Sequence, residues 1–191
     1  MKIIYHENYN IDVGIFKFLH PFDGCKFSKV RAALNAADVI APKSSIAEDA
    51  ILSSLNELLK IQVKDKAALC RALEIPKIPF LSFSWLDSRI LSPMRWGVAG
   101  TLTASHLALG GNDAWNLAGG YHHASPHRME GFCIYNDIIW LRPYSNQQCQ
   151  LKPHPHESLR LLDWQCYFFH NNYSNTPYRY WSTLPLHQKN H

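Results

Sequence analysis

Paired glycines followed, after one tyrosine, by paired histidines, within residues 119–124 (Gly-Gly-Tyr-His-His-Ala), constrain the fold more than any other feature of this chain. A short apolar run at residues 114–118 precedes them and has the composition of a buried strand. Open α/β folds place their sites where parallel strands end, on glycine-rich turns of this kind. The sequence therefore predicts that His122 and His123 lie at the carboxyl edge of a parallel sheet.

The segments before this turn alternate between strand and helix patterns. Residues 2–5 are β-branched or aromatic and predict an opening strand. Apolar residues at helical spacing predict a helix from about residue 24 to residue 38. They predict a second helix from the series Ile51, Leu55, Leu58 and Leu59. Ser45 and Glu48 have the spacing of a capping box at its start.

Small residues dominate the segment that leads to the glycine turn. Glycine and alanine interleaved with leucine over residues 97–109 predict a tightly packed, buried helix that ends at the glycines of residues 110–111. After the interruption by Pro76 and Pro79, residues 80–85 predict a loop or a short helix. Helices that alternate with short apolar strands favour the α/β class.

Composition excludes several classes of protein. Hydrophobic residues make up 47% of the chain and charged ones 18%, which is typical of a globular protein. The net charge of +4 is spread along the chain, so we expect no nucleic-acid and no membrane-surface partner. The five cysteines have no CxxC spacing, which favours reduced thiols in the cytoplasm over a disulfide framework. No signal peptide and no membrane span is expected.

A second motif lies eight residues beyond the histidines, at residues 131–137 (Gly-Phe-Cys-Ile-Tyr-Asn-Asp). Together with residues 119–124 it resembles the active-site core of the zinc-dependent histone deacetylase family. Residues 4–6, 20–23 and 100–101 are similar to the class IV branch of that family and its bacterial relatives. The resemblance covers about residues 1–138.

The resemblance implies a fold, a reaction and roles for several residues. The fold would be a partial, truncated three-layer αβα arginase/deacetylase fold around a parallel sheet. The reaction would be zinc-dependent hydrolysis of the amide of an acetylated or acylated lysine on a protein, or of a small acetylated amine. His122 and His123 would be the catalytic proton-transfer pair, and Gly131 and Phe132 would line the substrate tunnel. The remaining motif residues, Cys133, Tyr135 and Asp137, would be structural.

The sequence departs from the family pattern in two places. Residues 50–58 lack the histidine and tyrosine that the family carries before its Leu-x-x-Leu. After the second motif, the family's Asp-x-Asp-x-His ligand segment, its later aspartate and its carbonyl-polarising tyrosine have no counterpart. We therefore assign no metal ligands and no cofactor-binding residues, and expect that this chain alone binds no zinc and has no turnover.

Residues 139–191 differ in composition from the part before them. They are rich in aromatic residues, histidine and proline, and Glu157 and Asp163 are their acidic residues. We interpret this tail as a separate, atypical region, with a frameshift or a truncated gene copy as the hypothesis for its origin. A substitute metal site is an alternative, but its spacing matches no known pattern and we do not predict it. Its candidate ligands are Cys149, His154, His156 and Cys166.

Two other readings of the whole chain stay open. The chain is either a non-catalytic remnant that binds a partner, with self-association through an exposed sheet edge, or the unfolded product of a pseudogene. An enzyme releases acetate from an acetylated peptide, whereas a binding remnant does not. An unfolded product has no cooperative melting transition.

Overall fold

The computed structural model describes residues 1–14, 23–34, 38–76 and 81–138, all within the compact unit Met1–Gln150. The similarity at residues 20–22, residues 35–37 of the helix expected to run to about residue 38, and all predictions for residues 139–191 lie outside the described residues.

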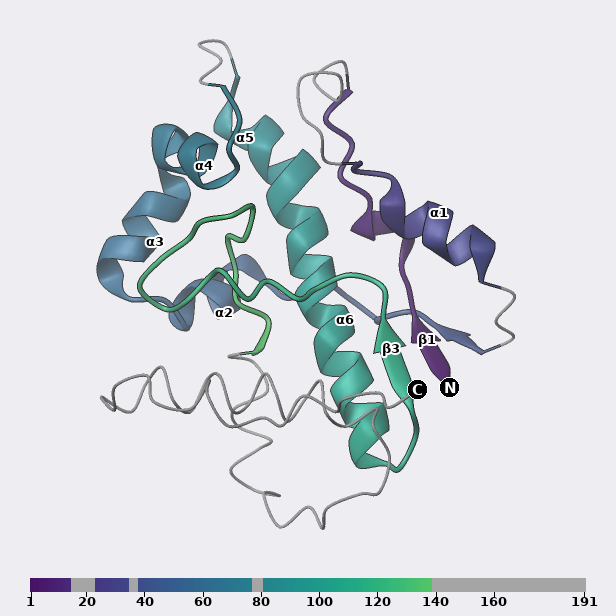
Figure 1. The fold of residues 1–191 in the computed structure, drawn as a ribbon. Coiled ribbons are helices and arrows are strands. Elements are labelled where there is room, and N and C mark those ends of the chain that lie inside the picture. Colours follow the sequence, from purple (N-terminus) through teal and green to yellow (C-terminus); the bar gives the residue numbers. More distant parts are fainter. Residues whose placement is uncertain (15–22, 35–37, 77–80, 139–191) are drawn as a thin grey trace, which may run out of the picture. The chain divides into compact units, whose positions relative to one another are not determined.

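The described strands form one parallel sheet in the order β2-β1-β3 (Figure 1). Strand β1 (Lys2–Ile4) lies in the middle and pairs with β2 (Val39–Ile40) and β3 (Ala114–Asn116). Ile3 and Ile4 are 1% and 0% exposed, and successive side chains of a strand point to opposite faces. Both faces of β1 are therefore covered, as in α/β proteins. The predicted α/β class with a parallel sheet is confirmed.

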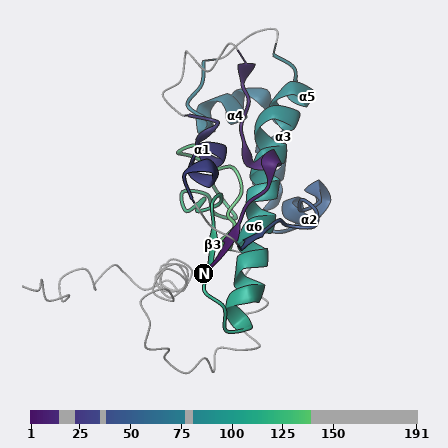
Figure 2. The same ribbon diagram turned by 90° about the vertical axis from the view of Figure 1, so that its right-hand side faces the viewer.

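Helices fill the connections between the strands. In chain order they are the 3-10 helix η1 (Glu7–Tyr9), α1 (Lys26–Ala33), α2 (Glu48–Ser53), α3 (Glu57–Lys64), α4 (Lys66–Ala72), α5 (Phe83–Leu86), the π-helical turn η3 (Asp87–Leu91) and α6 (Ser92–Leu109). Helix α6 contacts β1, β3 and η1. It lies between α1 and α2 in both views (Figures 1 and 2).

Helix α6 confirms the prediction of a small-residue helix and explains it. A Cβ atom at Gly97 would collide with the Tyr121 hydroxyl, and one at Gly100 would collide with the Tyr9 hydroxyl. Glycine is therefore needed where these tyrosines approach the helix axis. The helix begins five residues earlier than residue 97, at Ser92, with Pro93 in its first turn, and Gly110 follows its last residue.

The predicted helix around residues 51–59 is wrong as a single element. Helices α2 and α3 are separated by Ser54, Leu55 and Asn56. Asn56 Oδ1 accepts a hydrogen bond from Leu59 N at 2.7 Å and caps α3. The capping box is also wrong, because the residue before α2 is Ala47 and no side chain caps that helix.

Two further elements are shorter than expected. Helix α1 ends at Ala33 because Leu34 has an extended backbone, with ψ of 112°. Strand β3 ends at Asn116, and Trp115 is 46% exposed, so the prediction of a buried strand is wrong at that position. The parallel pairing and the position of the strand before the glycine turn are as predicted.

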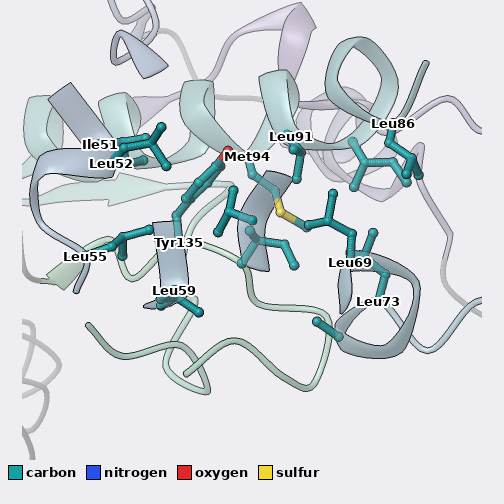
Figure 3. Packing of buried hydrophobic residues seen from close by; sticks show 14 of the residues in the cluster. Ile51, Leu52, Leu55, Leu59, Leu69, Leu73, Leu86, Leu91, Met94 and Tyr135 are labelled. Carbon is teal, nitrogen blue, oxygen red and sulfur yellow. The ribbon is translucent and has the colours of Figure 1, made fainter. Parts of the chain in front are cut away.

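The main hydrophobic core joins α2, α3, α4 and α6 to the segment that follows the histidines (Figure 3). Leu59, Leu69, Met94 and Tyr135 are each at most 1% exposed. Burial of one such side chain stabilises a fold by about 1.5–3 kcal/mol. Residues 120–138 have little regular structure, so their position depends on this packing. Within the part of the chain described, no helix is long and apolar enough to cross a membrane.

Candidate active site

Strand β3 leads into a turn that only glycine fits. Gly119 and Gly120 have φ of +85° and +75°, in the left-handed region that disfavours other residues. A Cβ atom at Gly119 would lie 2.5 Å from Thr101 Oγ1 and 2.7 Å from Asp137 Oδ2. The first glycine is thus required both by its backbone and by its close polar neighbours.

The buried side chain of Asp137 fixes this turn through hydrogen bonds. It is 1% exposed, and Oδ2 accepts hydrogen bonds from Thr101 Oγ1 at 2.7 Å and from Gly120 N at 2.8 Å. The other oxygen, Oδ1, accepts from Tyr121 N at 3.0 Å. A buried carboxylate is stable only when its oxygens are hydrogen-bonded, and these three bonds meet that need. They also fix the backbone just before the histidines.

Asn116, the last residue of β3, connects the strand to α6. Its Nδ2 donates to Gly97 O at 3.0 Å and to Thr101 Oγ1 at 3.1 Å. Its Oδ1 accepts from Ala118 N at 3.4 Å. Sheet, helix and glycine turn are therefore joined by one polar network.

His122 and His123 lie side by side on the exposed side of the turn. Their ring centroids are 4.2 Å apart, with 42° between the ring planes. His122 Nδ1 lies 2.8 Å from Gly120 O. A carbonyl oxygen only accepts, so in a neutral ring the proton sits on Nδ1 and the Nε2 lone pair is left for another proton. This is the arrangement that a general base needs.

His123 lies against the second motif. A Cβ atom at Gly131 would lie 3.0 Å from His123 Cγ and 3.1 Å from Cδ2. Gly131 and Phe132 both have positive φ, +56° and +62°, which is strained for phenylalanine. Phe132 N donates to Ala72 O at 2.9 Å and holds this turn against the end of α4. The structure thus brings His122, His123, Gly131 and Phe132 into one neighbourhood.

A second anchor fixes the loop between the two motifs. Asn56 N donates to Pro126 O at 2.9 Å. The Asn56 amide nitrogen also lies 2.8 Å from His127 Nδ1. Since Asn56 Oδ1 is used in the cap of α3, its Nδ2 is the donor to His127. The loop is therefore tied to the start of α3 as well as to α4.

The other motif side chains are buried and unreactive. Cys133 and Tyr135 are 7% and 0% exposed. Burial raises the pKa of the Cys133 thiol and the pKa of the Tyr121 hydroxyl, so both keep their protons at neutral pH. Burial also raises the pKa of Tyr135 to about 12. Tyr135 Oη lies 3.4 Å from Arg95 Nη1.

Sequence reasoning missed the residues that support the site. Arg95, 8% exposed, pairs through Nη1 and Nη2 with the carboxylate of Asp87, at 2.7 and 3.2 Å. Thr101 and Asn116 hold the glycine turn as described above. For Thr101, the similarity of residues 100–101 to the family was a signal, but it gave the threonine hydroxyl no role. The ion pair between Arg95 and Asp87 spans two turns of a continuous helix, and no sequence motif marks it.

The described residues do not fit a zinc centre. Such a centre takes at least three protein ligands from histidine, cysteine and carboxylates. Among residues 1–14, 23–34, 38–76 and 81–138, no group of three or more such side chains is placed to hold a metal ion. His122 and His123 supply two imidazoles, and both oxygens of Asp137 already accept hydrogen bonds from the turn and Thr101.

Comparison with known proteins identifies the family. A histone deacetylase domain model matches residues 47–152, more than half of the 191 residues. Histone deacetylase 2 of Arabidopsis thaliana is 30% identical over 144 residues, which are 72% of this chain and 37% of that protein. The acetoin utilization protein AcuC of Staphylococcus aureus (strain Mu50 / ATCC 700699) is 51% identical over 49 residues, 25% of this chain and 13% of AcuC.

An uncharacterized protein of Picosynechococcus sp. is 29% identical over 141 residues, 71% of this chain and 44% of that protein. The chain thus spans less than half the length of each of these relatives. The matched domain contains both the double-histidine turn and the Gly-Phe-Cys-Ile-Tyr-Asn-Asp motif. On this match, the chain belongs to the histone deacetylase family.

Proposed function

We propose that this chain carries the proton-transfer half of a deacetylase site, with His122 and His123 as its catalytic residues. The observation that supports this most strongly is the His122 ring, whose Nδ1 is occupied by Gly120 O while Nε2 is left for a proton. A second imidazole lies 4.2 Å away, centroid to centroid. Amide hydrolysis needs such groups to take a proton from water and to return one to the leaving amine.

The substrate class is an amide of an acetylated or acylated lysine, or of a small acetylated amine. The His123 ring packs against the bare backbone of Gly131, and the aromatic residue Phe132 follows at once. An aromatic ring and a bare backbone suit the apolar stem of an acyl-lysine. We assign the tunnel wall to Gly131 and Phe132, and the chain to the class IV branch with its bacterial relatives.

Zinc supplies the activated water in the family reaction. Since the described residues lack a ligand set, we propose that this chain by itself binds no zinc and releases no acetate. We also propose that the family's residue pattern ends near Ile138, within the domain match that runs to residue 152, and that residues 139–191 form a separate region. Sequencing of the encoding DNA tests its origin: an Asp-x-Asp-x-His segment in another reading frame after codon 138 supports a frameshift.

An acetyl-lysine peptide with added zinc tests this function. We expect the acetylated peptide, but not its unacetylated form, to shift the NMR signals of His122, His123 and Phe132. Acetate release should not exceed that of the double variant His122→Ala/His123→Ala. A peptide that shifts none of these signals contradicts the assigned site. Acetate release above the double variant contradicts the proposed lack of turnover.

A binding role is the second candidate, because β3 has a free edge within the described sheet. In the order β2-β1-β3, β3 pairs with β1 alone, and its Trp115 is 46% exposed. Such an edge favours association with another strand. Sedimentation should detect dimers that Trp115→Lys removes. Leu58→Lys, at a 71% exposed position on α3, is the control and should leave them unchanged.

The last part of the proposal is that the chain is located in the reducing environment of the cytoplasm. Cys25 and Cys133, two cysteines of the described residues, are not joined in a disulfide. Free thiols persist in the cytoplasm. Thiol titration of the unfolded chain without reductant should therefore find Cys25 and Cys133 reactive, and a titration that finds them oxidised contradicts a cytoplasmic location.

A further inference from the structure

Asp137 is joined to His122 through a single peptide group. Asp137 Oδ1 accepts a hydrogen bond from Tyr121 N at 3.0 Å, and this N–H belongs to the peptide between Gly120 and Tyr121. The carbonyl oxygen of the same peptide lies 2.8 Å from His122 Nδ1. Carboxylate, peptide and imidazole therefore form one continuous chain of hydrogen bonds.

Such a chain strengthens its own members. Consecutive hydrogen bonds polarise one another by an estimated ~10–30% per bond. A carboxylate at the N–H end draws the peptide dipole toward itself, which makes the carbonyl oxygen at the other end a stronger acceptor. Asp137 is 1% exposed, so water screens its charge little. The effect on the ring is to hold a proton on Nδ1.

The turn geometry makes this connection rigid. The other carboxylate oxygen, Oδ2, accepts from Gly120 N at 2.8 Å and from Thr101 Oγ1 at 2.7 Å. Two successive backbone N–H groups, of Gly120 and Tyr121, thus end on one side chain, and the peptide between them cannot rotate without losing a bond. The carbonyl therefore points at His122 before any substrate arrives.

We propose that Asp137 is a positioning residue that fixes His122 in its Nδ1–H tautomer through the Gly120–Tyr121 peptide. The Nε2 lone pair is then the one that takes up a proton. The use of that lone pair in amide hydrolysis rests on the proposed function, whereas the tautomer is a property of the folded chain alone.

NMR of the ring nitrogens in the ¹⁵N-labelled full chain, at a pH where the imidazoles are neutral, tests this. Asp137→Asn keeps the size of the side chain but sets an amide NH₂ group against either Tyr121 N–H or Gly120 N–H. Thr101→Val removes one hydrogen bond to the same carboxylate and keeps both backbone bonds, so it is the matched control. We expect Nδ1–H for His122 in the unmodified chain and in Thr101→Val, and loss of this single tautomer in Asp137→Asn.

A second measurement on the unmodified chain does not depend on the folding of Asp137→Asn. A scalar coupling between Tyr121 N and the Asp137 carboxylate carbon should be detectable across the hydrogen bond. His122 with its proton on Nε2 in the unmodified chain overturns the proposal, and so does Nδ1–H retained in a folded Asp137→Asn. The proposal is also overturned if Thr101→Val loses the single His122 tautomer to the same extent as Asp137→Asn. A chain that shows the tautomer but binds no acetylated peptide contradicts the proposed function only.

Discussion

The imidazole of His123 packs directly on the backbone of Gly131, where an added Cβ atom would lie 3.0 Å from Cγ of the ring. This contact connects the two motifs of the chain, which are eight residues apart. It explains why the second motif begins with glycine and why the two motifs occur together. It also makes the orientation of His123 sensitive to any side chain at position 131.

Gly131→Ala should displace the His123 ring and destabilise the fold. The left-handed backbone at φ of +56° costs a non-glycine residue about 1–2 kcal/mol, and the contact with the ring adds to this. Gly120→Ala is the matched control, since Gly120 has φ of +75° and open space around it. Urea unfolding and the His123 ring signals measure both effects. Equal losses and an unmoved His123 ring in the two variants contradict the contact.

Gly119→Ala should be more damaging than Gly111→Ala. Both glycines have positive φ, +85° and +81°, so the backbone strain is similar. A Cβ atom at Gly119 would also enter the polar network at Thr101 and Asp137. A Cβ atom at Gly111 would meet no such neighbour within 4 Å. Overpacking of this kind adds about 1–3 kcal/mol to the loss. Thermal melts of the two variants should differ accordingly, and coincident melts would show that the turn tolerates a side chain.

Leu58 and Leu59 are neighbours in α3 with opposite environments, 71% and 1% exposed. Leu59→Ala should lower the free energy of unfolding by about 2–5 kcal/mol because it leaves a cavity in the core. Leu58→Ala should change it by less than about 0.5 kcal/mol, as for other surface substitutions. Urea denaturation of both variants measures the difference. A large loss for Leu58→Ala would mean that α3 is rotated from the register described.

The same pair shows how far the sequence predicts the fold. The apolar periodicity finds helices here, but it counts Leu58 and Leu59 on one face, because it does not detect the break before Asn56. Asn56 caps a new helix, and the break changes the phase of the pattern. Strand β3, helix α6 and the turn at Gly119 were predictable, since each depends on local composition.

The contacts that hold the site together could not be predicted from the local sequence pattern. Asp137 reaches Thr101 across 36 residues and Tyr121 across 16, and no periodicity connects positions so far apart. The motif resemblance marked Asp137 as structural without showing what it holds. The contact of His123 with Gly131 likewise depends on how two irregular turns pack, which residue spacing alone does not give.

Stability should fall at high pH because of the buried tyrosines. Burial raises the pKa of Tyr135 from its ordinary value near 10 to about 12. Between pH 10 and 12 the unfolded chain loses this proton while the folded chain keeps it, so the free energy of unfolding decreases as pH rises. Tyr9 and Tyr121, whose pKa values burial also raises, act in the same direction.

Tyr135→Phe should therefore reduce this slope by up to about 1.4 kcal/mol per pH unit and leave the slope below pH 9 unchanged. Urea unfolding at a series of pH values between 8 and 12 measures it. An unchanged slope above pH 10 would show that Tyr135 titrates normally in the folded chain.

Zinc content of the purified full chain, measured by elemental analysis after incubation with zinc and dialysis, is the decisive test of the proposed site. We propose a proton-transfer pair without a ligand set, so we expect that no zinc is retained. A stoichiometric amount of zinc, retained by the unmodified chain and lost in the double variant His122→Ala/His123→Ala, would contradict it.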